Sequence, residues 1–282
     1  MSAGLNRFLA PCGTLVGVTN SEDASTESVL AGDILCRYRQ VYRESRESDS
    51  LLRYGRRTVA VSTIAQQFYC EKAVQFSIEQ PRAPTSEMLS GIAGHEAVAA
   101  LGVAMTAEQA VVEAVAAREK ALCIYEFRIG WRHSGVTVLG FVDEAWFRGG
   151  SVDLVAERKF SGSLTIHTPY HIQAALYCLG LGEMGFDTEH SRYRISVFKR
   201  ECHDCSLLKS GACRGTSAEA ESFTCEQGAC VSEVFPFHRE STSSSLDWAL
   251  EFWTGEREAE PTTHPARCRS CRFRRACEAC QA

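Results

Sequence analysis

The chain has 282 residues, of which 45% are hydrophobic and 23% charged, and its formal net charge is −5. This composition can build a core and excludes a disordered chain; the length allows one large domain or a domain with an appendage. The negative charge excludes indiscriminate coating of DNA, so any nucleic-acid contact must come from local basic patches. No apolar run approaches the roughly 18 residues of a membrane span, and the first residues are not typical of a signal peptide. We therefore expect a cytoplasmic protein without a membrane partner.

The chain contains fourteen cysteines, which is a high number. In a reducing cytosol, clustered cysteines are more often metal ligands than disulfides. Cys36, Cys123 and Cys178 lie within apolar or mixed runs, where a free cysteine behaves as a small hydrophobic residue. We assign these three no function.

The N-terminal part is the least regular. Residues 1–20 predict an added strand or a loose tail, and residues 21–57 are rich in Ser, Glu and Arg. Within the latter, VLAGDILCRYRQVY is apolar enough to pack, so this part is either a helix or a mobile arm ending in Arg53, Arg56 and Arg57. The charge pattern favours a solvated face.

Three helices are predicted next. The first is capped by the Ser-Thr pair that follows TVAV, carries Cys70 inward and ends at PRAP. The second runs through GIAGHEAVAALG with His95 near its start, and a lone histidine on an apolar helix face is more often a core residue than a ligand. Thr106 and Gln109 form a capping-box pattern that opens the third.

From Cys123 the hydrophobic period changes to two. CIYEFRIGW, VTVLGFVDEAWF and SVDLVAERKF predict three strands of a meander, with turns at HSG and RGG. A helix follows from Pro169 to about Gly182, and SRYRISVFKR predicts another strand. These elements predict an α/β core with a small mixed sheet flanked by helices.

The second and third strands carry a candidate metal site. Asp143 lies near the end of one strand, and Glu157 and Lys159 project from one face of the next. Two carboxylates are hard ligands for Mg²⁺ or Mn²⁺, and a lysine beside them positions a water or neutralises a phosphate. A Glu-x-Lys pair is also common on the solvated face of an antiparallel strand. Asp153 is a rival carboxylate but lies about 13 Å from Glu157 along the strand, too far to share an ion.

Residues 201–230 are a cysteine-rich insertion. Its thiols are Cys202, Cys205, Cys213, Cys225 and Cys230. A C-x2-C followed by further thiolates is typical of a small tetrahedral Zn²⁺ module, although these spacings match no standard finger. The segment is either a zinc-stapled insertion or a loop of unligated thiols.

The C-terminal segment follows a predicted helix, DWALEFWTGERE. Cys268, Cys271 and Cys277 form a C-x2-C-x5-C pattern that needs one more ligand for a [4Fe–4S] cluster, and either Cys280 or Cys70 could supply it. Five arginines surround these thiols: Arg267, Arg269, Arg272, Arg274 and Arg275. They indicate either a solvated basic tail or a phosphate-tracking patch.

Six motifs in this order resemble the RecB-type branch of the PD-(D/E)XK nucleases. They are QQFYCEKAVQF, GIAGH, GFVD, ERK, QAALY and the terminal C-x2-C-x5-C. The two cysteine motifs resemble the iron–sulfur members of that branch, the exonuclease V family and the Cas4 family of CRISPR adaptation nucleases. The match runs from Val59 to Cys280, interrupted by the insertion. It departs from the family in lacking Pro before the Asp and in having Phe160 after the lysine.

The resemblance implies a restriction-endonuclease-like α/β nuclease domain formed by residues 58–200 and 231–282, with 1–57 as an N-terminal extension. It implies the following roles: His95, Asp143 and Glu157 bind the catalytic metal, Lys159 completes the hydrolytic site, and Gln173 and Tyr177 contact DNA or support the site. It further implies that Cys70, Cys268, Cys271 and Cys277 hold a cluster that joins the N- and C-terminal segments, which leaves Cys280 spare.

The implied activity is metal-dependent exonuclease digestion of single-stranded DNA in DNA repair or processing, with a structural [4Fe–4S] cluster. One alternative is a CRISPR adaptation nuclease that trims prespacers beside an integrase. A second is a non-catalytic iron–sulfur DNA-binding module, which the complete His/Asp/Glu/Lys set disfavours.

Overall fold

A computed structural model describes residues 22–47, 51–102, 104–118, 120–216 and 222–280; the strand or tail predicted for residues 1–20 lies outside these ranges. The helices are α1 (Glu22–Glu47), α2 (Val61–Glu79), α3 (Ser86–Ala99), α4 (Ala107–Ala116), α5 (Thr168–Met184), α6 (Ser206–Lys209), α7 (Arg239–Thr254) and α8 (Pro265–Ser270). The strands are β1 (Thr58–Ala60), β2 (Leu122–His133), β3 (Val136–Arg148), β4 (Ser151–Ser161), β5 (Arg192–Lys199), β6 (Ser222–Thr224) and β7 (Cys230–Pro236).

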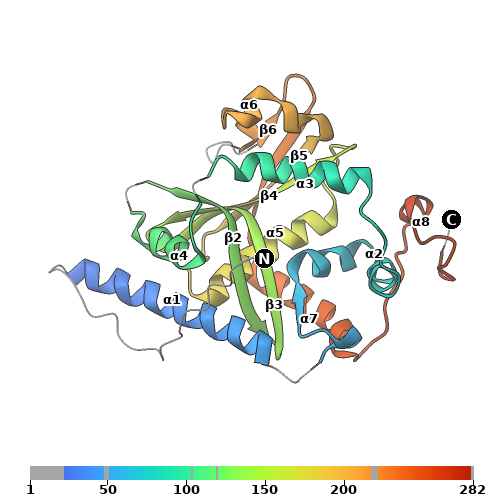
Figure 1. The fold of residues 1–282 in the computed structure, drawn as a ribbon, viewed down its shortest axis with the longest axis horizontal. Coiled ribbons are helices and arrows are strands. Elements are labelled where there is room, and N and C mark those ends of the chain that lie inside the picture. The colour runs from blue at the N-terminus through green and yellow to red at the C-terminus, as the bar shows by residue number, and fades with distance from the viewer. Residues whose placement is uncertain (1–21, 48–50, 103, 119, 217–221, 281–282) are drawn as a thin grey trace, which may run out of the picture.

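The strands form one mixed seven-stranded sheet flanked by helices (Figure 1). Its order is β1-β3-β4-β5-β7-β6, with β2 pairing the other edge of β3. The predicted α/β core and the β2–β3–β4 meander are confirmed. Ser134 and Gly135 both have positive φ in the first turn (47° and 80°), as a tight turn between right-twisted strands requires.

The two edges of β3 are used differently. β2 pairs with β3 along nearly its whole length, so β1 and β4 must share the opposite edge. β4 pairs antiparallel with residues 144–148 of β3, and β1 pairs parallel with residues 137–139. β3 and β4 therefore separate at Asp143, and this divergence opens the space in which the candidate site lies.

Alternation along β4 separates two cores, because successive side chains of a strand point to opposite faces. The larger core lies between the sheet and a set of helices that includes α5. The smaller core lies under α3 and the cysteine-rich insertion, and it contains Val98, Phe160 and Phe198. Figure 1 shows α3 lying beside the α6 and β6 region.

The expectation of a solvated face or mobile arm in residues 21–57 is only partly met. α1 is one continuous helix, and its Ala31, Ile34, Leu35 and Tyr38 are buried in the larger core. This i, i+3, i+4, i+7 spacing is one helical face, so the charged residues occupy the other. The mobile-arm alternative is wrong for Arg53, which donates a hydrogen bond of 2.8 Å to the Phe252 carbonyl.

Three helix starts test the local signals. The Thr106–Gln109 capping box is confirmed, with both reciprocal hydrogen bonds formed. The Ser-Thr cap predicted for α2 is wrong, because the helix begins at Val61 without a side-chain cap. α7 begins at Arg239, earlier than predicted, and the hydroxyls of its serine-rich first turns donate to carbonyls within the helix. No helix in the described ranges is both long and apolar enough to cross a bilayer.

Candidate functional site

Asp143 is held at the divergence of β3 and β4 by a buried network. Its Oδ2 accepts a 2.8 Å hydrogen bond from the Arg158 backbone N–H, and the Arg158 guanidinium donates to the Asp143 carbonyl at 3.1 Å. The same guanidinium pairs with Glu144 at 2.6 Å, and Arg194 pairs with the other Glu144 oxygen at 2.9 Å. All four residues are buried. The network fixes the position of one carboxylate while leaving its second oxygen available.

His95 reaches this carboxylate from α3. Its Nδ1 lies 3.5 Å from Asp143 Oδ2, and 28% of its side chain remains exposed. Burial lowers the pKa of His95 against the opposing attraction of Asp143, which favours a neutral imidazole with a lone pair free for a metal. A Cβ on Gly94 would lie 2.4 Å from the Phe160 ring, so the glycine lets α3 approach β4 closely. Because it is partly exposed and faces a carboxylate, His95 is not an ordinary core histidine.

Glu157 and Lys159 form a buried pair beside Asp143. The Glu157 carboxylate is fully buried and lies 2.5 Å from Lys159 Nζ; apart from this ion pair, neither oxygen has a hydrogen-bond partner among the described residues. Burial and repulsion by Asp143 raise the pKa of Glu157 to about 8. Burial acts to lower the pKa of Lys159, but the Glu157 and Asp143 carboxylates together act against it and the net direction is upward. The solvated-strand alternative for this Glu-x-Lys pair is therefore wrong.

α5 supports the lysine through a chain of hydrogen bonds. Lys159 Nζ donates to Gln173 Oε1 at 3.1 Å, and Gln173 Nε2 donates to the Tyr177 hydroxyl at 2.8 Å. Tyr177 packs against Gly140, where an added Cβ would lie 3.1 Å from the ring. Both Gln173 and Tyr177 are buried, so this geometry suits support of Lys159 better than direct contact with a polymer.

Sequence reasoning missed Glu126, on β2. Its carboxylate, His95 and Asp143 each offer a ligand atom, and these atoms lie within 4.8 Å of one another. Glu126 has φ of 52° inside a strand, between the paired residues Tyr125 and Phe127. Such backbone strain concentrates at functional sites. The sequence signal was a carboxylate between two aromatic residues of a mainly apolar strand, which also carries Arg128 as a charged neighbour.

These donors fit a hard divalent cation. One imidazole nitrogen and carboxylate oxygens suit Mg²⁺ or Mn²⁺, and Glu157 adds a buried carboxylate that pairs with Lys159. Within the described residues, the group with single-ion spacing is His95, Glu126 and Asp143. Glu157 is outside that group but faces it, as its interaction with Asp143 shows.

A second site lies between α2 and the C-terminal segment. α2 breaks at Cys70, whose φ of −173° and ψ of 113° are extended. The thiols around this break line one pocket; they belong to Cys70, Cys268, Cys271, Cys277 and Cys280. Both candidates for the fourth cluster ligand, Cys70 and Cys280, are therefore present in it.

The C-terminal segment is docked on α2 by direct contacts. Arg267 Nη1 donates to the carbonyls of Phe68 and Tyr69, at 3.2 and 2.8 Å, just where the helix breaks. Phe273 stacks on Phe76 with ring centroids 5.7 Å apart. Arg267 is thus a structural residue rather than part of a free basic patch, whereas the other four arginines of the predicted patch are exposed.

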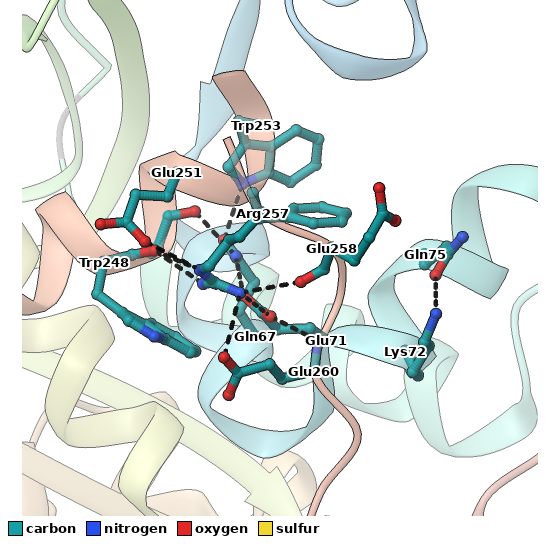
Figure 2. A network of polar contacts seen from close by, with 12 residues as sticks. Gln67, Glu71, Lys72, Gln75, Trp248, Glu251, Trp253, Arg257, Glu258 and Glu260 are labelled. Atoms are coloured by element: carbon teal, nitrogen blue, oxygen red, sulfur yellow. Dashed lines mark hydrogen bonds and ion pairs between the residues drawn. The ribbon is translucent and has the colours of Figure 1, made fainter. Parts of the chain in front are cut away.

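A buried polar network beside Cys70 joins the same two parts of the chain (Figure 2). Glu71 accepts two hydrogen bonds from Arg257, at 2.5 and 2.8 Å, and a third from the Glu260 backbone N–H at 2.9 Å. Gln67 donates to Glu71 at 2.7 Å and accepts from Trp253 Nε1 at 2.8 Å. The network ties α2 to α7 and to the segment that leads to the terminal cysteines.

The pocket fits a thiolate-bound cluster. The ligands of a [4Fe–4S] cluster bind different iron atoms, so they surround a space instead of meeting at one point. The Phe273 backbone N–H donates to Cys271 Sγ at 3.4 Å. The five cysteines of the insertion lie apart from this pocket, in or against the smaller core.

Together these features define an α/β protein with an acidic, histidine-containing site and a buried lysine at two diverging strands. No protein-family model matches the chain, and no curated protein matches it. Among solved structures, the crystal structure of a protein designated SSO0001 is similar at 13% identity, with 88% of this chain and 96% of that chain covered and a TM-score of 0.45. A likeness this weak carries no inference about fold subtype or function.

Proposed function

We propose that this protein is a metal-dependent nuclease of the RecB-like PD-(D/E)XK class that digests single-stranded DNA from an end. The observation that carries the proposal is the convergence of His95 and Asp143 with the buried Glu157–Lys159 pair at the divergence of β3 and β4. The order of these elements along the chain is the one that the motif resemblance implies. Both the PD-(D/E)XK type of the core and the nuclease activity are proposed.

Each site residue has a distinct part in the chemistry. A bound divalent cation would lower the pKa of a water and stabilise charge on the scissile phosphate. His95, Asp143 and Glu126 would hold it, since their ligand atoms already lie together, and Glu157, which faces them, would add a further carboxylate. Lys159, whose pKa is raised by the Glu157 and Asp143 carboxylates against the effect of burial, would neutralise a phosphate oxygen and orient the attacking water. Gln173 keeps the ammonium group in place.

An exposed aromatic residue next to the site supports a single-stranded substrate. Phe141 is 50% exposed and lies two residues before Asp143, so both project from the same face of β3. The Arg128 guanidinium lies over its ring at 5.3 Å from the centroid. An aromatic ring beside a cation is the arrangement on which unpaired bases stack. A duplex offers no free base face for this contact.

The pocket between α2 and the C-terminal segment would hold a structural [4Fe–4S] cluster. Cys70, Cys268, Cys271 and Cys277 are the ligands that the resemblance implies, and all four line the pocket. Linking Cys70 to Cys268 closes a loop of about 200 residues, which restricts the unfolded chain strongly. The cluster would hold the C-terminal arginines beside the nuclease domain.

Digestion of an end-labelled single strand with Mn²⁺ tests the proposal. We expect Asp143→Asn and Lys159→Met to reduce cleavage by at least about 100-fold, the usual scale for losing one electrostatic group of a catalytic site. Asp153→Asn is the matched control, because this carboxylate is on the same strand as Glu157 but pairs with Arg148 at the surface.

Wild-type protein that does not cleave with either Mg²⁺ or Mn²⁺ would refute the proposal. Cleavage retained in both Asp143→Asn and Lys159→Met would refute the assigned site. Iron content should be the same in all of these variants, because the substitutions are remote from the thiol pocket.

A further inference from the structure

The five thiols of the insertion gather in one small core rather than along a loop. Cys202 and Cys230 are buried in it with Val98, Phe160, Phe198 and Leu208, and Cys205, Cys213 and Cys225 pack against it. The insertion has few other hydrophobic residues. These thiols alone therefore give it only a weak hydrophobic core. A loop of unligated thiols gives no reason for this convergence.

The converging thiols come from separate turns. Cys202 lies in the short 3₁₀ helix Arg200–Asp204, Cys205 precedes α6, and Cys213 precedes a second 3₁₀ turn. Cys225 begins the turn between β6 and β7. Burial raises the pKa of Cys213, and the neighbouring thiols of Cys205 and Cys225 raise it further. The thiols of these separate turns therefore meet in one small core.

Two of the turns begin at a cysteine whose carbonyl accepts a hydrogen bond from the N–H three residues later. The Cys205 N–H donates to the Cys202 carbonyl at 2.9 Å, and the Gly228 N–H donates to the Cys225 carbonyl at 2.7 Å. The same turn closes at the terminal C-x2-C, where the Cys271 N–H donates to the Cys268 carbonyl at 3.1 Å. Cysteines separated by two residues, as in Cys202 and Cys205, have the spacing typical of zinc ligands.

We propose that Cys202, Cys205, Cys213 and Cys225 bind one structural Zn²⁺. Binding replaces four thiol protons, which leave to solvent, by one tetrahedral ion. Among the described residues the sulfur atoms are not at single-ion spacing, so binding requires their side chains to rotate inward. For Cys202 this rotation replaces the 3.1 Å hydrogen bond from its Sγ to the Ala229 carbonyl. The thiols lie within and against a small apolar core, and sulfur ligands of this kind suit one tetrahedral ion.

Cys230 and His203, the other possible ligands in the insertion, make different contacts. Cys230 lies within β7, in register with Phe198, and its Sγ would be 2.8 Å from a Cβ at Gly215. This close packing leaves its sulfur no freedom to turn. His203 directs Nδ1 to the Arg200 carbonyl at 2.6 Å and Nε2 to Asp204 Oδ2 at 3.1 Å, so both of its ring nitrogens are already engaged.

The zinc module supports α3. Val98 of α3 belongs to the same small core, one helical turn after His95, and both α6 and the 3₁₀ helix Arg200–Asp204 contact α3. An ion that holds the insertion together therefore also restrains the helix that carries His95. The site itself does not depend on the proposed nuclease activity.

Metal analysis of anaerobically purified protein tests the site. We expect about one zinc per chain in the wild type. Cys205→Ser and Cys213→Ser should lose it while keeping the iron bound at Cys268. Cys230→Ala and Cys36→Ser are the matched controls and should keep zinc. In the opposite direction, Cys268→Ser should lose iron and keep zinc.

Two measurements on wild-type protein avoid variants that fail to fold. Replacing zinc with Co²⁺ should give thiolate-to-cobalt charge-transfer absorption and the visible bands of a tetrahedral ion. Removing zinc with a chelator should increase amide hydrogen exchange in α3 more than in α1. Wild-type protein without zinc, a second set of iron atoms in its place, or zinc retained in both Cys205→Ser and Cys213→Ser would overturn the assignment.

Discussion

Replacing Arg257 with Met tests the network that connects α2 to the C-terminal segment. Methionine keeps an unbranched apolar stem but removes both hydrogen bonds to Glu71 and the 2.8 Å hydrogen bond to the Trp248 carbonyl. The Glu71 side chain is only 1% exposed, so its charge would stay buried with donors from Gln67 and one backbone N–H alone. The variant therefore exposes the cost of an uncompensated buried carboxylate.

The expected magnitude follows from burial. Removing one partner of a buried ion pair costs about 3–5 kcal/mol. Arg257 keeps 16% of its side chain exposed, so water reaches the gap and we expect the lower end, about 3 kcal/mol. Arg257→Lys keeps the charge but loses the two-pronged geometry, and about 1–2 kcal/mol is expected.

Urea unfolding followed by tryptophan fluorescence measures this loss, because Trp248 and Trp253 belong to the same network. Arg148→Met is the control: its pair with Asp153 is half exposed and should contribute less than about 1 kcal/mol. An Arg257→Met variant as stable as this control would refute the reasoning. Iron content should fall in Arg257→Met, because the network adjoins Cys70.

Three further predictions follow from other parts of the structure. Glu144→Gln should lower the free energy of unfolding by about 3–5 kcal/mol, because it leaves two buried guanidiniums without their shared carboxylate. Urea unfolding measures this loss, and a loss no larger than that of Asp153→Asn contradicts the prediction. Burial and repulsion by the neighbouring aspartate raise the pKa of Glu157 to about 8, so a proton competes with the cation below that pH. Calorimetric Mn²⁺ affinity should therefore rise from pH 6 to 8 and then level off, and a flat profile contradicts this protonation. Gly140→Ala should destabilise the protein by about 1–3 kcal/mol, because a Cβ there would lie 3.0 Å from a valine methyl and 3.1 Å from a tyrosine ring. Gly32 of α1 has open space around it, so Gly32→Ala should not destabilise the protein in the same unfolding assay.

Local patterns in the sequence predicted the parts of the fold that depend on neighbouring residues. Period-two hydrophobicity predicted β2, β3 and β4, since side-chain alternation is a property of the strand itself. The capping box at Thr106 was equally local. Helix starts without a side-chain cap, as at Val61, left no such signal and were misplaced.

These local patterns could not predict contacts between distant segments of the chain. Glu126 joins His95 and Asp143 because a distorted β2 backbone turns it toward them. The bond between Glu71 and Arg257 spans most of the chain. Glu126 and Arg257 belong to no motif named above, and each acquires its partner only when distant segments have packed.

By itself, the sequence determined which side chains carry chemistry: the acids and lysine on two adjacent strands, the histidine on its helix and two sets of clustered thiols. Only the tertiary structure decided that β1 and β4 share one edge of β3, which opens the site at Asp143. Only packing placed Cys70 with the terminal thiols and the other cysteines under α3. The physical reason is that side-chain chemistry and strand periodicity are local, whereas strand divergence and the meeting of distant ligands depend on burying two cores at once.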